Sequence, residues 1–309
     1  MFWLIRAIYF IRLGRPLFLV GGIILYLLGT TIALYDGVAI NLAVLLWGQI
    51  AVTAVQVMTH YSNDYFDLYA DRTNPTPMRW SGGSGILPAG YVSPSLALAA
   101  ALAAGVFALG AALWLALALP TGPLALPLIL LALFLAWTYS APPLQLHSTG
   151  AGEVAAAFLV AGLTPLTGYY LQAGRLSLLP LLAVAPLVVL QFIMLVLIEF
   201  PDAQGDAAVG KDTLVVRLGP ARTARLLLGV VALHILLLPV LYVAGLPALV
   251  TAGVALFNLP GLLWLAWRLH QGAWAHAAWW NWLGFVGIVL IVGSALVQLV
   301  TFGALYALH

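Results

Sequence analysis

The sequence predicts an all-α integral membrane protein, a single domain over residues 1–309 with nine transmembrane helices around a central cavity. Three observations predict this class. The chain is 64% hydrophobic and only 6% charged, whereas about a quarter of the residues in a soluble domain are charged. Nine stretches are apolar enough to cross a bilayer, which takes a helix of about 20 residues. Two long polar connections interrupt an otherwise apolar chain.

Turn signals separate most of the predicted spans. Asp36-Gly37, Pro120-Thr121-Gly122 and Gly174-Arg175 are examples, and Gly, Pro and Asp at such positions favour turns over helix. The nine spans are expected at 16–35, 38–60, 94–119, 123–140, 151–172, 178–199, 223–245, 247–268 and 281–305. The N-terminal residues interleave arginines with aromatic residues, so no cleavable signal peptide is expected.

The basic residues predict how the helices are oriented. If the N-terminus is cytoplasmic, ten of the eleven lysines and arginines lie on the inner side, and only Arg175 lies outside. Cytoplasmic loops of membrane proteins carry such an excess of basic residues. We therefore expect the N-terminus and the polar connections after the second and sixth spans, 61–93 and 200–222, to lie in the cytoplasm. The membrane itself is expected to be a prokaryotic cytoplasmic membrane.

Two classes of chemistry are excluded by composition. The formal net charge of +2 is too small to indicate a nucleic-acid partner, and the chain has no cysteine. The absence of cysteine rules out disulfides, thiolate nucleophiles and cysteine-ligated metals. The expected surroundings are a lipid bilayer.

Seven of the nine acidic residues lie in the two polar connections or at their edges. Asp64, Asp67 and Asp71 are three and four residues apart, so a continued helix would stack them on one face. Three like charges on one face repel unless a cation compensates them. Mg²⁺ takes oxygen ligands, commonly one or two carboxylates completed by water and substrate phosphate. Asp64, Asp67 and Asp71 are therefore predicted magnesium ligands.

The second window repeats this pattern. Glu199, Asp202 and Asp206 have the same spacing, although Pro201 is expected to end the helix at Phe200. Lys211 follows and supplies a compact positive charge suited to phosphate. Asp202 and Asp206 are predicted magnesium ligands too. Two acidic clusters, one lysine and an apolar bundle together indicate a metal-bridged diphosphate that carries an apolar chain.

These motifs resemble those of the UbiA superfamily of membrane prenyltransferases. Asn63-Asp64-x-x-Asp67-x-x-x-Asp71 is similar to its first aspartate motif, and the run from Asp202 to Gly219 resembles its second. The second run, with Tyr139–Pro143, Gly150–Glu153 and Gly168–Gly174, is most similar to the 1,4-dihydroxy-2-naphthoate branch of menaquinone synthesis. The sequence departs from that branch at Glu199 and Pro201, near which the branch usually has Asn and Arg.

The resemblance implies Mg²⁺-dependent transfer of a polyprenyl group from its diphosphate to an aromatic acceptor, expected to be 1,4-dihydroxy-2-naphthoate. Cation–π contacts from tyrosines would stabilise an allylic cation. The implied catalytic residues are Asp64, Asp67, Asp202, Asp206 and Lys211. The implied substrate-binding residues are Asn63, Arg72, Arg79, Tyr139, Tyr169 and Lys211. The run Gly82-Gly83-Ser84-Gly85 is expected to lie over the diphosphate site.

Other functions remain open on the sequence alone. Within the superfamily, the acceptor could be 4-hydroxybenzoate, homogentisate, a lipid or a tetrapyrrole. An intramembrane aspartyl protease would pair Asp64 with Asp206, but it needs one lone carboxylate from each helix. A cation transporter would place its acidic sites near the bilayer midplane, whereas these lie at predicted helix ends.

Overall fold

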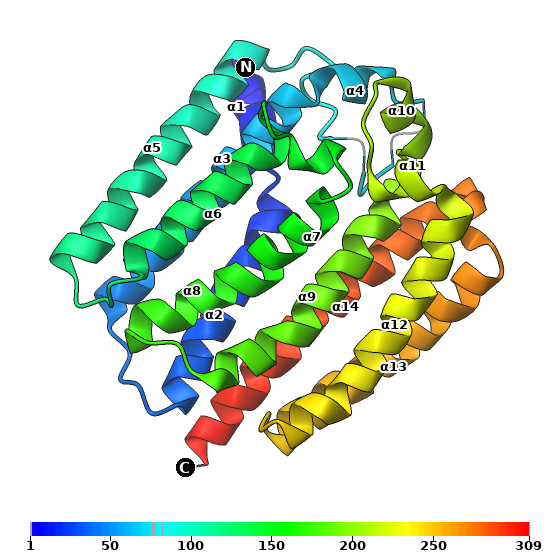
Figure 1. Ribbon diagram of the computed structural model, residues 1–309. Helices are drawn as coiled ribbons and strands as arrows, with labels where there is room; N and C mark the ends of the chain where they lie inside the picture. Colours follow the sequence, from blue (N-terminus) through cyan, green and yellow to red (C-terminus); the bar gives the residue numbers. More distant parts are fainter. Residues whose placement is uncertain (1, 76–77, 82, 309) are drawn as a thin grey trace.

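The computed structural model describes residues 2–75, 78–81 and 83–308, and every regular element in these ranges is helical (Figure 1). The elements, in chain order, are α1 (Phe2–Leu13), α2 (Pro16–Tyr35), α3 (Leu42–Phe66), α4 (Leu68–Thr73), α5 (Pro94–Ala118), α6 (Ala125–Ser140), η1 (Leu146–Ser148), α7 (Gly152–Ala157), η2 (Phe158–Leu163), α8 (Thr164–Ala173), α9 (Leu178–Glu199), α10 (Ala203–Ala208), α11 (Leu214–Leu218), α12 (Pro220–Val243), α13 (Ala248–His270), η3 (Ala273–Ala275) and α14 (Ala277–Ala307).

The described residues contain eight helical spans long and apolar enough to cross a membrane. One of them, Gly152–Ala173, is continuous through α7, the π-helical turn η2 and α8. The ninth predicted span corresponds to α6, which is apolar but has only 16 residues. The all-helical membrane class is therefore confirmed, and eight of the nine predicted spans meet the full length.

The long helices run side by side, and their short partners gather at one end of the bundle (Figure 1). Helix α3 packs on α5, α2 packs on α8, and α14 packs on α9, α2 and α13. The short helices α4, α10 and α11 lie at the same end as the N-terminus, and the C-terminus lies at the opposite end (Figure 1). Both predicted polar connections are therefore at one end of the molecule.

Glycines allow a close helix crossing between α2 and α8. A Cβ atom on Gly29 would lie 1.8 Å from the Pro165 carbonyl oxygen, and one on Gly168 would lie 2.2 Å from the Tyr26 carbonyl oxygen. Small residues of this kind let membrane helices approach backbone to backbone, where packing rather than the hydrophobic effect holds them together. This crossing fixes α8 against α2.

Local sequence signals define several helix ends. The Asn41 side chain accepts hydrogen bonds from the Ala43 and Val44 amides at the start of α3, and Ser93 caps α5 with Pro94 as its first residue. Such caps satisfy amides that have no partner within the helix. Helix α8 ends at Gly174, which has a φ of 66°, a conformation that glycine adopts without strain.

Neither aspartate motif forms one continuous helix. Helix α3 ends at Phe66, so Asp67 lies at the break and Asp71 lies on α4. The expected stacking of three carboxylates on a single helix face is therefore wrong. In the second motif α9 ends at Glu199 and α10 begins at Ala203, which confirms the predicted break at Pro201. These breaks turn the two motifs toward each other.

Candidate active site

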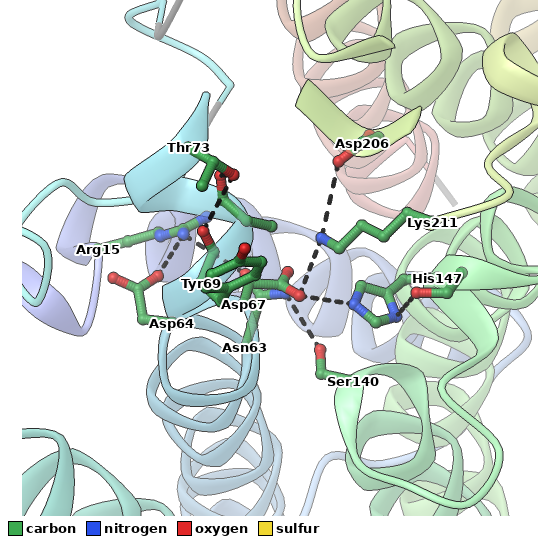
Figure 2. A network of polar contacts seen from close by, with 12 residues as sticks. Arg15, Asn63, Asp64, Asp67, Tyr69, Thr73, Ser140, His147, Asp206 and Lys211 are labelled. Carbon is green, nitrogen blue, oxygen red and sulfur yellow. Dashed lines mark hydrogen bonds and ion pairs between the residues drawn. The ribbon is translucent and has the colours of Figure 1, made fainter. Parts of the chain in front are cut away.

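Asp67 is the centre of the polar network at the N-terminal end of the bundle (Figure 2). Its Oδ1 atom lies 2.7 Å from His147 Nε2 and 2.9 Å from Lys211 Nζ. Its Oδ2 atom accepts a hydrogen bond of 2.8 Å from Asn63 Nδ2, which also contacts Ser140 Oγ at 3.0 Å. Asp67 thus joins α3, α6, the connection between α6 and α7, and the second aspartate motif.

Asp64 is fully buried and contacts a different cation. Its Oδ1 atom lies 2.5 Å from Arg15 Nη2, and its Oδ2 atom accepts hydrogen bonds from the Ser84 hydroxyl and backbone amide. Arg15 lies in the turn between α1 and α2, with a left-handed φ of 49°. The N-terminal helix is therefore attached directly to the first aspartate motif.

Positively charged side chains, and not only a metal ion, can compensate the negative charge of the first motif. Burial by itself would raise the pKa of Asp67, but the hydrogen bond from His147 and the positive charge of Lys211 outweigh it and lower that pKa to about 2. Burial, followed by the charges of Asp67 and Asp64, raises the pKa of Asp71 to about 7. The expected repulsion between the carboxylates therefore contributes to the raised pKa of Asp71 and is not shared equally by all three.

The second motif meets the first through Lys211. The Lys211 ammonium lies between Asp67 and Asp206, 3.8 Å from the Asp206 Oδ1 atom (Figure 2). Burial alone would lower the pKa of this ammonium, but Asp67 and Asp206 outweigh it and raise that pKa. Asp202 accepts a hydrogen bond of 2.7 Å from the Asn74 amide, just beyond α4. Residues from both predicted clusters thus share one site.

The described part of the glycine-rich run contacts the first motif, and its expected place over a diphosphate stays a prediction. Gly83 has a φ of 71°, and a Cβ atom there would lie 1.9 Å from the Asp71 Oδ2 atom. The next residue, Ser84, bonds to Asp64. Gly82, the first residue of the run, lies outside the described residues. The described part of the run therefore covers two of the three carboxylates in the first motif.

The donor set suits a magnesium ion that is held jointly with substrate. Within the described ranges, no group of three or more His, Cys, Asp or Glu side chains is arranged to hold a metal by itself. Carboxylate oxygens from both motifs nevertheless converge there, and the Asp71 Oδ2 atom is buried without a hydrogen-bond partner. Mg²⁺ commonly uses one or two carboxylates and takes its other ligands from water and phosphate. The site therefore fits this ion.

Among the described contacts, three predicted substrate residues make none with Asp67 or Lys211. Arg72 is exposed on α4, and the Arg79 guanidinium stacks 4.8 Å from the Trp80 ring centroid. Tyr169 lies on α8, where its hydroxyl donates to Asp36 Oδ2 at 2.5 Å and contacts Ser177. Because Asp36 follows the end of α2 at the far side of the bundle, Tyr169 lies away from Asp67 and Lys211, and its role in substrate binding stays a prediction.

The structure keeps Tyr139 close to the site. Its ring centroid lies 5.6 Å from that of His147, and its hydroxyl lies within electrostatic reach of Glu199, Asp67 and Asp206. Glu153, at the start of α7, accepts a hydrogen bond of 2.6 Å from the Leu214 amide. It also interacts with Glu199, and each of the two glutamates has one buried oxygen without a partner. Asp64 and Asp206 contact separate cations, not each other as a protease pair would.

Sequence reasoning missed Arg15, His147 and the full role of Ser84. Arg15 was visible only as one of several positive-inside residues near the N-terminus, because its partner is 49 residues away. His147 lies between two segments that carried the family resemblance, Tyr139–Pro143 and Gly150–Glu153. That position was the only signal for it, and the signal does not name a partner.

Two cavities lie outside the polar network. One, of about 430 Å³, is lined by α12 and α13 residues that include Pro239, Tyr242 and Asn258. The other, of about 450 Å³, lies between the second-motif segment and Trp274 and Trp280. Neither is lined by the aspartates, so the expected central cavity stays a prediction.

Comparison with known proteins places this architecture in a family. The model of the UbiA prenyltransferase family matches residues 22–287. Digeranylgeranylglyceryl phosphate synthase of Methanoregula boonei is 36% identical over 204 residues, which are 65% of this chain and 64% of that protein. The matched part therefore spans just under two thirds of that relative.

Solved structures share the fold. A structure described as digeranylgeranylglyceryl phosphate synthase has a TM-score of 0.65 at 16% identity and covers 96% of this chain and 99% of its own. A UbiA homologue from Archaeoglobus fulgidus, bound to DMAPP and Mg²⁺, has a TM-score of 0.61 at 14% identity and covers 94% and 99%. With the family match over most of the chain, these findings show that the protein is an integral membrane enzyme that belongs to the UbiA prenyltransferase family.

Proposed function

We propose that this enzyme transfers a prenyl group from its diphosphate to an acceptor in a Mg²⁺-dependent reaction. The observation that carries the proposal is the bridge from Asp67 through Lys211 to Asp206, which brings both aspartate motifs to one point. A solved homologue bound to DMAPP and Mg²⁺ supports the same pair of ligands. The carboxylates Asp64, Asp67, Asp71, Asp202 and Asp206 would hold the metal.

Bound Mg²⁺ would supply positive charge against the diphosphate as it departs. The chain contributes the remaining charge and shape. Lys211 is close enough to both motifs to contact a diphosphate held between them, and Arg15 balances Asp64 from the other side. Tyr139 places an aromatic ring beside the site, where a π face stabilises an allylic cation. The apolar bundle would surround the prenyl chain and exclude water.

For the acceptor we propose the hydroxyl of a glyceryl phosphate lipid. The relative from Methanoregula boonei is a digeranylgeranylglyceryl phosphate synthase. We therefore prefer a lipid acceptor to the 1,4-dihydroxy-2-naphthoate expected from the sequence. In the reaction the bond between the allylic carbon and the diphosphate oxygen breaks, the same carbon bonds to the hydroxyl oxygen, and the hydroxyl proton passes to the released diphosphate. Glu199 departs from the naphthoate branch at a position near the site, which supports an acceptor other than the naphthoate.

One assay tests both halves of this proposal. Purified enzyme would receive geranylgeranyl diphosphate, Mg²⁺ and either geranylgeranylglyceryl phosphate, 1,4-dihydroxy-2-naphthoate or 4-hydroxybenzoate, with products identified by mass spectrometry. We expect product with the lipid acceptor, and none in the presence of a chelator. Product with an aromatic acceptor alone would contradict the lipid proposal but not the diphosphate site. Full turnover in chelator would contradict the metal.

We further propose that nine helices cross the membrane, with the aspartate motifs on the cytoplasmic side. The N- and C-termini lie at opposite ends of the bundle (Figure 1), which an odd number of crossings requires, so the short helix α6 would cross as well. Reporter fusions after Leu305 and within 200–222 should report opposite sides of the membrane. The same side at both positions would contradict this topology.

A further inference from the structure

His147 is held on three sides within the connection between α6 and α7. Its Nδ1 atom lies 3.2 Å from the Ser148 hydroxyl, and its ring packs 5.6 Å from that of Tyr139. Gly152 packs against its backbone, since a Cβ atom on Gly152 would lie 2.6 Å from the His147 Cα. His147 is also buried, with 8% of its surface exposed. The imidazole therefore has a fixed position and direction.

The Nε2 atom of His147 points at Asp67 (Figure 2). A carboxylate oxygen only accepts hydrogen bonds, so at 2.7 Å the nitrogen that faces it must carry the proton. This holds whether Nδ1 accepts from the Ser148 hydroxyl or donates to it. His147 is thus a hydrogen-bond donor to Asp67 in either protonation state.

The contacts of Asp67 leave one direction open for a further ligand. A carboxylate offers about four lone-pair positions on its two oxygens. His147 and Lys211 occupy those on Oδ1, and Asn63 occupies one on Oδ2. The remaining position is on Oδ2. Hydrogen bonds from outside the coordination sphere orient ligating carboxylates in this way.

We propose that His147 is a positioning residue, which directs the Oδ2 atom of Asp67 toward the magnesium ion. This inference rests on the proposed Mg²⁺-dependent transfer and assigns a role that neither aspartate motif contains. His147 does not touch the metal or the substrate in this role. It acts through Asp67 alone.

The same connection also contacts the second motif. The Asp212 amide donates to the Ser148 carbonyl oxygen at 3.2 Å, and the Leu214 amide donates to Glu153 at 2.6 Å. Both donors lie within three residues of Lys211. The segment from His147 to Glu153 therefore holds the Asp67 side chain of the first motif and the backbone next to Lys211 in the second. It keeps the two motifs at a constant separation.

Two substitutions separate positioning from packing. In His147→Gln the amide nitrogen lies near the position of Nε2 and can donate to Asp67, whereas in His147→Asn it lies near that of Nδ1 and cannot reach. Mn²⁺ alone is the probe, and its binding to the purified, substrate-free enzyme is measured from the electron paramagnetic resonance signal of the free ion. Apparent Mg²⁺ requirement for turnover and thermal unfolding are measured on the same samples.

We expect His147→Gln to bind Mn²⁺ within about 3-fold of the wild type, and His147→Asn to bind it about 10–100-fold more weakly, the range for lost outer-sphere hydrogen bonds. Both variants should unfold at similar temperatures. Wild-type Mn²⁺ affinity in His147→Asn would overturn the inference, and so would an equal loss in both variants. If the wild-type enzyme itself bound no Mn²⁺ and needed no Mg²⁺, the proposed function would fail instead.

Discussion

The two aspartate motifs contribute similar carboxylates, but among the described contacts the ion pairs of the first motif are the shorter ones. Asp64 lies within 3 Å of Arg15, and Asp67 lies within 3 Å of Lys211. In the second motif, Asp206 lies 3.8 Å from Lys211, and Asp202 accepts a hydrogen bond from the neutral Asn74 amide. Buried ion pairs are strongly destabilising when one partner is removed, because a charge is left without compensation. The first motif is therefore part of the scaffold as well as the site, whereas Asp206 of the second motif is held less tightly by Lys211.

The largest effect is expected from substitutions that compare the motifs directly. Asp67→Ala and Asp206→Ala should each lower turnover on the order of 10³-fold, because each removes charge from the transition-state site. Only Asp67→Ala should also lower the unfolding free energy, by roughly 3 kcal/mol, since it leaves Lys211 and His147 without their shared partner. Turnover and thermal unfolding in detergent measure both. Equal stability of the two variants would contradict the comparison.

Lys211, the link between the motifs, should affect one substrate more than the other. Lys211→Met is expected to raise the KM for the prenyl diphosphate about 10–100-fold, which matches the loss of a hydrogen bond to a charged group. The KM for the acceptor should change little. Lys211→Arg keeps the charge and should recover part of the affinity. An effect confined to the acceptor would reverse the assignment of the two substrates.

Two glycines in one loop test whether that loop fits closely over the first motif. Gly83 and Gly85 have nearly the same φ, 71° and 70°, so alanine strains the backbone about equally at both, by roughly 1–2 kcal/mol. A Cβ atom at Gly83 meets the Asp71 carboxylate, while one at Gly85 meets nothing within 4 Å. Gly83→Ala should therefore lower turnover about 10-fold more than Gly85→Ala. Identical kinetics would mean that the loop does not press on Asp71.

The smallest effect is expected at the opposite end of the bundle. Tyr169→Phe removes the hydroxyl that contacts Asp36 and Ser177 and should lower the unfolding free energy by about 1 kcal/mol. The kcat and both KM values should stay at the wild-type level, because Tyr169 is remote from the two aspartate motifs. A selective rise in the KM for the prenyl diphosphate would restore Tyr169 to the substrate site.

The sequence alone determined the membrane class, the two acidic windows and the reaction family. Apolar stretches of about 20 residues identify spans because a bilayer leaves no other way to satisfy the backbone. Carboxylates at their ends, such as Asp64 and Asp206, are conspicuous because charge is so rare in this chain. These signals are local, and each can be seen in a window of a few residues.

Only the tertiary structure decided which cation meets which carboxylate. Arg15 reaches Asp64 across 49 residues, and His147 reaches Asp67 across 80. Periodicity could not reveal these pairs, nor could it separate Tyr139, beside the site, from Tyr169, which lies on the far side. In both cases the helix crossings and the breaks at Asp67 and Pro201 set the direction of the side chain. Spacing along the chain specifies a face of one helix, but the charge balance of a buried site depends on how several helices meet.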